Sequence, residues 1–302
     1  MYIVYGLMCL LFGTTFLAIK VGVDAGVPPF LFAGTRFLTA GVIVLIAMKL
    51  LGKKIALQPK SIWDVFLVGI FMTAVMFGCL YWGERYISSS VAALLAATTP
   101  IMIAIVEWVQ GVRKNVWIKG CGLLLSFIGV VIAVLPALGV EVTQKAILAV
   151  VIILVAEIGC VFGTMKSKKI LTGGLSPFLL NGWQMVIGGI TLVLLSRIVE
   201  PTRVAMNEQI AFSWIYLVVC GSLIGHGSYY WLVLRAGPLL PSTWTYISPV
   251  IAQFVGFYFL SEYVSIYSFL GLGLVLSGVF LVSRADILEN WFKEQLKKVV
   301  PS

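Results

Sequence analysis

Two ionisable residues lie inside otherwise apolar stretches of the sequence, where a charge is costly in a membrane. Arg36 follows Pro29 by seven residues, and Glu157 follows Lys145 by twelve. At roughly 1.5 Å of rise per residue, these spacings place Arg36 about 10 Å and Glu157 about 18 Å along their helices. Arg36 either attracts an anionic substrate group, such as a carboxylate, or pairs structurally at a helix junction. Glu157 either binds a coupling proton or a substrate amine, or stays neutral in a hydrogen bond between helices.

His226 is the single histidine of the chain. A lone imidazole cannot build a metal site, so no metal is expected there. Two interpretations stay open, a hydrogen-bonded helix contact and a proton relay.

Two prolines, Pro100 and Pro249, interrupt apolar stretches. A proline inside a helix leaves the carbonyl four residues earlier without its hydrogen bond. Inside a membrane, such carbonyls are tolerated where they line a cavity or where another helix satisfies them. We therefore predict helix kinks at both prolines and a pathway near them. Its predicted polar lining comprises Thr98, Thr99, Asn181, Gln184, Tyr230, Tyr246 and Gln253.

The elements that must position these residues follow from composition. The chain has 302 residues, 61% of them apolar and 11% charged, whereas a soluble domain has about half apolar and a quarter charged residues. Its mean hydropathy is +1.07. These values exclude disordered, collagen-like and ordinary cytosolic proteins. The fold class we predict is an all-α polytopic membrane protein.

Apolar runs separated by short polar loops predict ten membrane-spanning helices. Their approximate bounds are Tyr2–Lys20, Pro29–Met48, Ile62–Trp82, Ser88–Trp108, Trp117–Leu138, Ala146–Met165, Pro177–Ser196, Phe212–Leu234, Leu239–Leu260 and Ile266–Ser283.

Lysine and arginine mark the orientation of these spans. With the N-terminus in the cytoplasm, 15 of them fall in loops on the inner side and five on the outer side, and Arg36 lies within a span. Cytoplasmic loops are enriched in these residues, so both termini are expected in the cytoplasm of a cell membrane protein. The net charge of +9 then reflects orientation, and no nucleic acid partner is expected. Residues 284–302 alternate as an amphipathic helix suited to an anionic inner leaflet.

The sequence also repeats itself. A constant offset aligns Lys20 with Lys168, Gly34 with Gly182 and Gly41 with Gly189, and an offset one residue longer aligns Gly122 with Gly271 and Pro100 with Pro249. The chain therefore divides into halves at residues 1–138 and 139–283. Because each half has five spans, the second must be inverted relative to the first. Inverted repeats are typical of secondary transporters, whose binding site lies between the halves.

Several segments of these repeats resemble those of EamA-like proteins in the drug/metabolite transporter superfamily. They are Phe12–Lys20, Pro28–Phe30, Arg36–Phe37, Ala40–Gly41, Glu84–Pro100, Ser248–Pro249 and Phe259–Glu262. The resemblance covers almost the whole chain and implies ten helices in two inverted repeats that export or exchange small organic solutes. One position departs from the family pattern, because Arg113 stands where the family has an acidic residue.

We therefore expect a secondary transporter that exports or exchanges small metabolites, amino acids or related solutes, by alternating access. An uncoupled, channel-like facilitator is the alternative, and a membrane enzyme is a further one. No nucleotide-binding loop, metal-ligand cluster or nucleophile motif occurs, so neither catalysis nor a cofactor is expected. The expected partners are a small-molecule substrate and the lipid bilayer, while proton coupling and a homodimer stay open.

Overall fold

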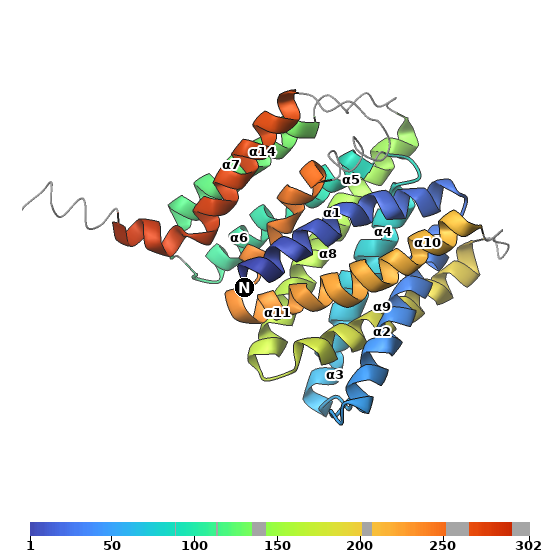
Figure 1. The fold of residues 1–302 in the computed structure, drawn as a ribbon. Helices are drawn as coiled ribbons and strands as arrows, with labels where there is room; N and C mark the ends of the chain where they lie inside the picture. The colour runs from blue at the N-terminus through green and yellow to red at the C-terminus, as the bar shows by residue number, and fades with distance from the viewer. Residues whose placement is uncertain (88, 113, 135–142, 201–206, 252–265, 292–302) are drawn as a thin grey trace, which may run out of the picture.

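The computed structural model describes residues 1–302 apart from residues 88, 113, 135–142, 201–206, 252–265 and 292–302. Each regular element in this part of the chain is a helix (Figure 1), as the predicted fold class requires. The first half contains α1 (Tyr2–Asp24), α2 (Pro29–Leu50), α3 (Pro59–Val68), η1 (Gly69–Val75), α4 (Met76–Gly83), α5 (Ser89–Ala96), α6 (Thr99–Val109) and α7 (Val116–Val134). The second half contains α8 (Gln144–Thr172), α9 (Pro177–Val199), α10 (Glu208–Tyr216), η3 (Leu217–His226), α11 (Gly227–Ala236), α12 (Leu239–Ser242) and α14 (Ile266–Ser283).

Eight helices among the described residues are long and apolar enough to cross a membrane, and a bent pair at the C-terminal end makes a ninth. The predicted span at residues 239–260 is described only as far as residue 251. Large apolar side chains remain exposed on the outside of the bundle, with Trp117 87% and Ile198 81% exposed. Such a surface needs lipid rather than water around it. The chain is a multi-pass membrane protein.

Short turns join the helices where the sequence supplies the necessary residues. Pro29 and Pro177 stand in the first turns of α2 and α9, where a missing N–H costs no hydrogen bond. Just ahead of them, Gly26 and Gly174 have φ of +87° and +97°, a conformation that favours glycine. Corresponding helices of the two halves thus begin in the same way, with a glycine at positive φ followed by a proline in the first turn.

Glycines let two pairs of corresponding helices touch backbone to backbone. A Cβ on Gly41 of α2 would lie 2.8 Å from the carbonyl oxygen of Gly182 in α9. A Cβ on Gly129 of α7 would lie 2.7 Å from the carbonyl oxygen of Gly271 in α14. Figure 1 shows α7 and α14 side by side at one edge of the bundle. The absence of a side chain at each glycine therefore permits a backbone-to-backbone approach that any larger residue would prevent.

The third span of each half contains a π-helical segment, η1 in the first half and η3 in the second. Each continues directly into an α-helix, so α3, η1 and α4 form one span, as do α10, η3 and α11. A π-helical turn has an extra residue, which rotates the side chains that follow it, and it occurs frequently at functional sites.

The fourth and ninth spans are both broken, but not in the same way. Residues 97–98 interrupt the fourth span, and Pro100 lies in the first turn of α6 directly after the break. In the ninth span the described break lies at Thr243, and the helix then continues through Pro249 to residue 251. A break at Thr243 was not predicted. The ninth span is thus interrupted six residues before Pro249, nearer its start than predicted. At the break the chain forms turn-type hydrogen bonds, from Thr243 N–H to Leu240 O (3.2 Å) and from Tyr246 N–H to Thr243 O (3.0 Å).

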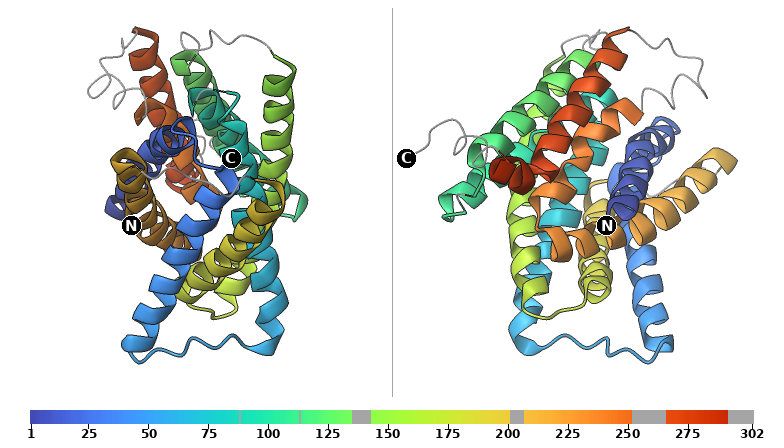
Figure 2. Two further views of the ribbon diagram at one scale, coloured as in Figure 1. Left: turned by 90° about the vertical axis from the view of Figure 1, so that its right-hand side faces the viewer. Right: turned by 60° about the vertical axis from the view of Figure 1, so that its left-hand side comes forward.

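The start of the chain and the end of α14 lie at the same end of the bundle. The guanidinium carbon of Arg284 lies 5.2 Å from the centroid of the Tyr2 ring. After α14, a helix at Ala285–Trp291 bends away by 74°, and Asp286 in it pairs with Lys114 at 3.1 Å. Figure 2 shows this short helix turned across the direction of the bundle, an arrangement suited to the membrane surface proposed for the tail. The rest of the predicted tail, residues 292–302, lies outside the described residues.

Candidate functional site

A cavity lies inside the bundle. It brings together four residues predicted from the sequence: Arg36, Thr99, Glu157 and His226. These come from α2, α6, α8 and η3, which belong to both halves. The remaining wall is mostly apolar and aromatic, formed by Phe12, Thr15, Phe16, Ile19, Met72, Met76, Phe77, Leu80, Ala96, Cys160, Tyr229, Ser242, Trp244 and Thr245.

Arg36 is a buried cation held by neutral partners. Its side chain is 1% exposed. Its Nε donates to Ser222 Oγ at 2.9 Å and its Nη1 to the Tyr81 hydroxyl at 2.7 Å, and the guanidinium carbon lies 4.5 Å from the Phe37 ring centroid. In the part of the chain that the structure describes, Arg36 forms no ion pair. Hydroxyls and an aromatic face fix the guanidinium without neutralising it, so it can still bind an anion.

The second half carries a neutral counterpart of this arrangement. The repeat aligns Gln184 with Arg36 and Thr73 with Ser222, and the Thr73 hydroxyl donates to Gln184 Oε1. Gln184 Nε2 in turn donates to Asn181 Oδ1 at 3.2 Å. The same contact between halves is therefore made twice, once with a charge and once without.

Glu157 on α8 lines the cavity and contacts the fourth span just after its break. It is 1% exposed and accepts a hydrogen bond from the hydroxyl of Thr99, the first residue of α6. This contact joins α8 of the second half to α6 of the first. A carboxyl that faces a cavity and has a hydroxyl partner is equipped to exchange a proton or to bind an amine there.

His226 ends the π-helical segment η3. Its Nδ1 lies 2.9 Å from the carbonyl oxygen of Gly221, and a carbonyl only accepts, so this nitrogen carries the hydrogen. The ring packs against Phe12, Phe37 and Phe77, with centroids 5.1, 5.6 and 5.4 Å away. This hydrogen bond lies within η3 itself, and the two interpretations of His226 from the sequence stay predictions. Among the described residues, no group of three or more His, Cys, Asp or Glu could hold a metal ion.

Trp244 is a wall residue that the sequence analysis did not single out. Its ring lies 4.5 Å from Phe12 and 6.1 Å from Phe16, centroid to centroid. It directly follows the break at Thr243, which the sequence analysis did not predict. No feature of the sequence separates Trp244 from tryptophans that only anchor a helix at the membrane surface.

A layer of polar contacts surrounds Met72 beside the cavity. Its sulfur accepts from Tyr230 at 3.5 Å, Ser167 at 3.6 Å and Thr164 at 3.8 Å. The Thr164 and Tyr229 hydroxyls lie 3.1 Å apart. These contacts join η1, α8 and α11, so they hold both halves together next to the cavity.

Other predicted pathway residues are not on the wall of this cavity. The Thr98 hydroxyl donates to the Leu95 carbonyl at 2.7 Å, and Asn181, Gln184 and Tyr230 make the contacts given above. Tyr246 is fully buried, and its hydroxyl has no hydrogen-bond partner. Gln253 lies outside the described residues.

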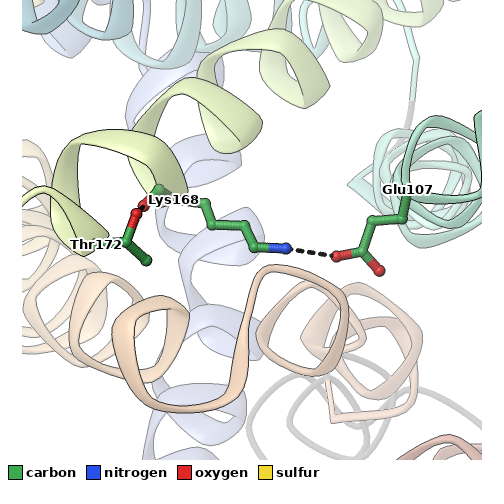
Figure 3. Close-up of polar contacts among 3 residues, drawn as sticks. All are labelled: Glu107, Lys168 and Thr172. Carbon is green, nitrogen blue, oxygen red and sulfur yellow. Dashed lines mark hydrogen bonds and ion pairs between the residues drawn. The ribbon is translucent and has the colours of Figure 1, made fainter. Parts of the chain in front are cut away.

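An ion pair joins the halves at another level of the bundle (Figure 3). Lys168 Nζ on α8 lies 3.1 Å from Glu107 Oε1 on α6. Glu107 is 8% exposed. Figure 3 shows the two side chains extended towards each other from separate helices, so the pair ties α6 to α8.

Comparison with known proteins decides the family. The profile of the EamA-like transporter family matches residues 1–135 and 147–284. The chain belongs to the EamA-like transporter family. The resemblance predicted from the sequence is therefore confirmed, and the chain is a transporter by family.

Individual relatives agree with this membership. The chain is 27% identical over 285 residues to the uncharacterized inner membrane transporter YedA of Escherichia coli (strain K12), covering 92% of this chain and 89% of that protein. It is also 27% identical over 284 residues to an uncharacterized transporter of Archaeoglobus fulgidus, covering 94% and 98%. A solved crystal structure superposes with a TM-score of 0.80 at 17% sequence identity, covering 95% of this chain and 98% of the other. That likeness shows a shared fold.

Proposed function

We propose that this EamA-like transporter exports or exchanges small amphoteric metabolites, of which amino acids are the simplest, by alternating access. One observation carries the proposal: Arg36 and Glu157, two buried ionisable residues of opposite sign, line the same cavity. A solute with both a carboxylate and an amine matches such a pair of groups.

In the proposed binding mode, each part of such a solute has a separate place in the cavity. The Arg36 guanidinium, fixed by Ser222 and Tyr81, would bind the carboxylate. Glu157 would receive the amine or, in another step of the cycle, a proton. The aromatic wall at Phe12, Phe16 and Trp244 would cover an apolar side chain. Because the wall residues come from both halves, movement of one half against the other would change access to the site.

The proposed location is the cytoplasmic membrane with both termini in the cytoplasm. The distribution of Lys and Arg supports this orientation. The contact of Tyr2 with Arg284 supports the proposal that the first residues and the end of the last span lie on the same side of the membrane. The proposed transporter performs no chemical reaction on its solute and needs no cofactor.

Solute flux into proteoliposomes tests this function. Purified protein is reconstituted, loaded with one unlabelled amino acid at a time, and assayed for uptake of the labelled form by exchange. We expect exchange of some amphoteric solutes and none of their amide derivatives, which lack the carboxylate. Absence of flux for a broad panel, with protein that elutes as a single folded species, would refute the proposal. Equal flux of acids and amides would refute the role of Arg36.

A further inference from the structure

Glu84 is a buried carboxyl that no contact in the described structure explains. It follows α4, one residue beyond the membrane-spanning helix Pro59–Gly83. Its side chain is 0% exposed, and both carboxyl oxygens lack a hydrogen-bond partner. An ionised carboxylate without partners is strongly disfavoured inside a protein. The geometry therefore requires a neutral, protonated Glu84 in this conformation.

A cation is held beside Glu84 but is engaged elsewhere. Lys20 Nζ donates to the main-chain carbonyl oxygen of Glu84 at 2.8 Å, and the same amine pairs with Asp24 at 2.9 Å. Burial raises the pKa of the Glu84 carboxyl well above its ordinary value, the Lys20 charge lowers it, and the Asp24 charge raises it further. Lys20 is thus placed where a small rearrangement would bring it to the carboxyl group.

Two other charged side chains near this end contact the ring of Tyr86. Arg85 and Lys145 both lie over the ring of Tyr86, at 5.8 and 5.6 Å from its centroid. The helix α5 that follows contains no charged residue. Among the described residues, Lys20 and Asp24 of α1 are the charges that act on the Glu84 carboxyl.

Glu84 is also linked to the cavity. Tyr81 lies one turn earlier on α4, is fully buried, and accepts the hydrogen bond from Arg36 at 2.7 Å. A change at the end of α4 that moves Glu84 would also move Tyr81, because the two residues are three positions apart and lie on the same face of the helix end. The protonation of Glu84 is in this way connected to the position of the Arg36 guanidinium.

Building on the transport function proposed above, we propose that Glu84 is a second proton-binding site of this protein, at the end of the bundle opposite Tyr2. While the end of α4 is buried, the carboxyl oxygen keeps its proton. When this end opens to water, the O–H bond breaks, the proton leaves to water, and Lys20 exchanges Asp24 for the new Glu84 carboxylate. Closing the end reverses each of these steps.

Infrared spectroscopy of the purified protein in lipid tests this site directly. We expect the carbonyl stretch of a protonated carboxylic acid at neutral pH, lost in Glu84→Gln and lost in the wild type as pH rises. Glu157→Gln identifies the band of the other buried carboxyl. Lys20→Met should move the loss of the Glu84 band to higher pH, and Asp24→Asn should move it to lower pH. Arg85→Gln is the matched control and should leave it in place.

An unchanged spectrum in Glu84→Gln, with a folded protein, would overturn the proposal. If Glu84→Gln does not fold, the proposal is tested by the opposite pH shifts of the band in Lys20→Met and Asp24→Asn. If neither variant shifts the band, the proposal is wrong. The spectra report the protonation of Glu84 and do not depend on transport. They therefore test this proposal even if the proteoliposome assay shows no solute exchange. Where exchange is measurable, its dependence on outside pH should flatten in Glu84→Gln, while the rate at low pH stays within about twofold of the wild type.

Discussion

Arg36 Nε donates to Ser222 Oγ at 2.9 Å, a contact between the second span of one half and the third span of the other. The repeat-related contact, from Thr73 to Gln184, has the same form without the charge. The two halves thus form the same kind of contact twice, and among the described residues only the Arg36 copy presents a cation to the cavity. We infer that the charge at position 36 gives the cavity its selectivity, since the other copy shows that the joint itself needs no charge.

Arg36→Lys tests this assignment. An ammonium cannot reproduce the planar fork that reaches Ser222 and Tyr81 together, so we expect affinity for a carboxylate-bearing solute to fall at least about tenfold, roughly 1.4 kcal/mol. Equilibrium binding of labelled solute to purified protein measures it. The exposed Arg85→Lys is the control and should bind as the wild type does. Unaltered binding by Arg36→Lys would make Arg36 a structural residue.

Glu157→Gln separates coupling from passage. The amide keeps the size of the side chain and can still meet the Thr99 hydroxyl, but it carries no proton. We expect accumulation driven by a proton gradient to disappear while solute exchange persists. Both are measured in the same proteoliposomes, with Thr99→Val as a control that removes the hydrogen bond and keeps the carboxyl. Full accumulation in Glu157→Gln would assign this residue a structural role.

Gly129→Ala tests the close contact of α7 with α14. The new Cβ would lie 2.7 Å from the carbonyl oxygen of Gly271, so the helices must separate, at a cost of about 1–3 kcal/mol. Gly120→Ala on the same helix is the matched control, because its Cβ would meet nothing within 4 Å. Thermal unfolding in detergent should show a lower Tm for the first variant and not for the second. Equal Tm values would contradict the contact.

Lys168→Gln removes the ion pair shown in Figure 3 and leaves Glu107, which is 8% exposed, without its cation. Since Lys168 itself is about one third exposed, we expect a modest loss of stability, about 1 kcal/mol. The double variant Glu107→Lys, Lys168→Glu should recover part of it. A double variant less stable than both single variants would show that the pair is not the stabilising element.

The orientation of the chain is a separate prediction. Single cysteines placed at Lys53 and Lys169, in a variant without the native cysteines, should react with a membrane-impermeant thiol reagent only after the cells are opened. A cysteine at Asp24 should react in intact cells, because Asp24 is exposed at the opposite end of α1. Labelling of position 53 in intact cells would reverse the proposed topology.

The sequence was sufficient for the fold class, the family and most helix limits. Apolar runs as long as a bilayer is thick permit few structures other than helices, and α2 and α9 begin at Pro29 and Pro177 as predicted. Arg36 and Glu157 were identifiable because charge is rare and costly in such runs. These features depend on residue type and spacing along one chain segment, which the sequence contains in full.

The tertiary structure decided which candidates share a cavity. Arg36, Thr99, Glu157 and His226 meet there, whereas Gln184 and Tyr230 turn to other partners. The direction of a side chain depends on how each helix is rotated, and here π-helical turns and the break at Thr243 set that rotation. The unpartnered state of Glu84 likewise exists only once the helices surround it. Such relationships arise from packing between distant segments, and local sequence patterns do not encode them.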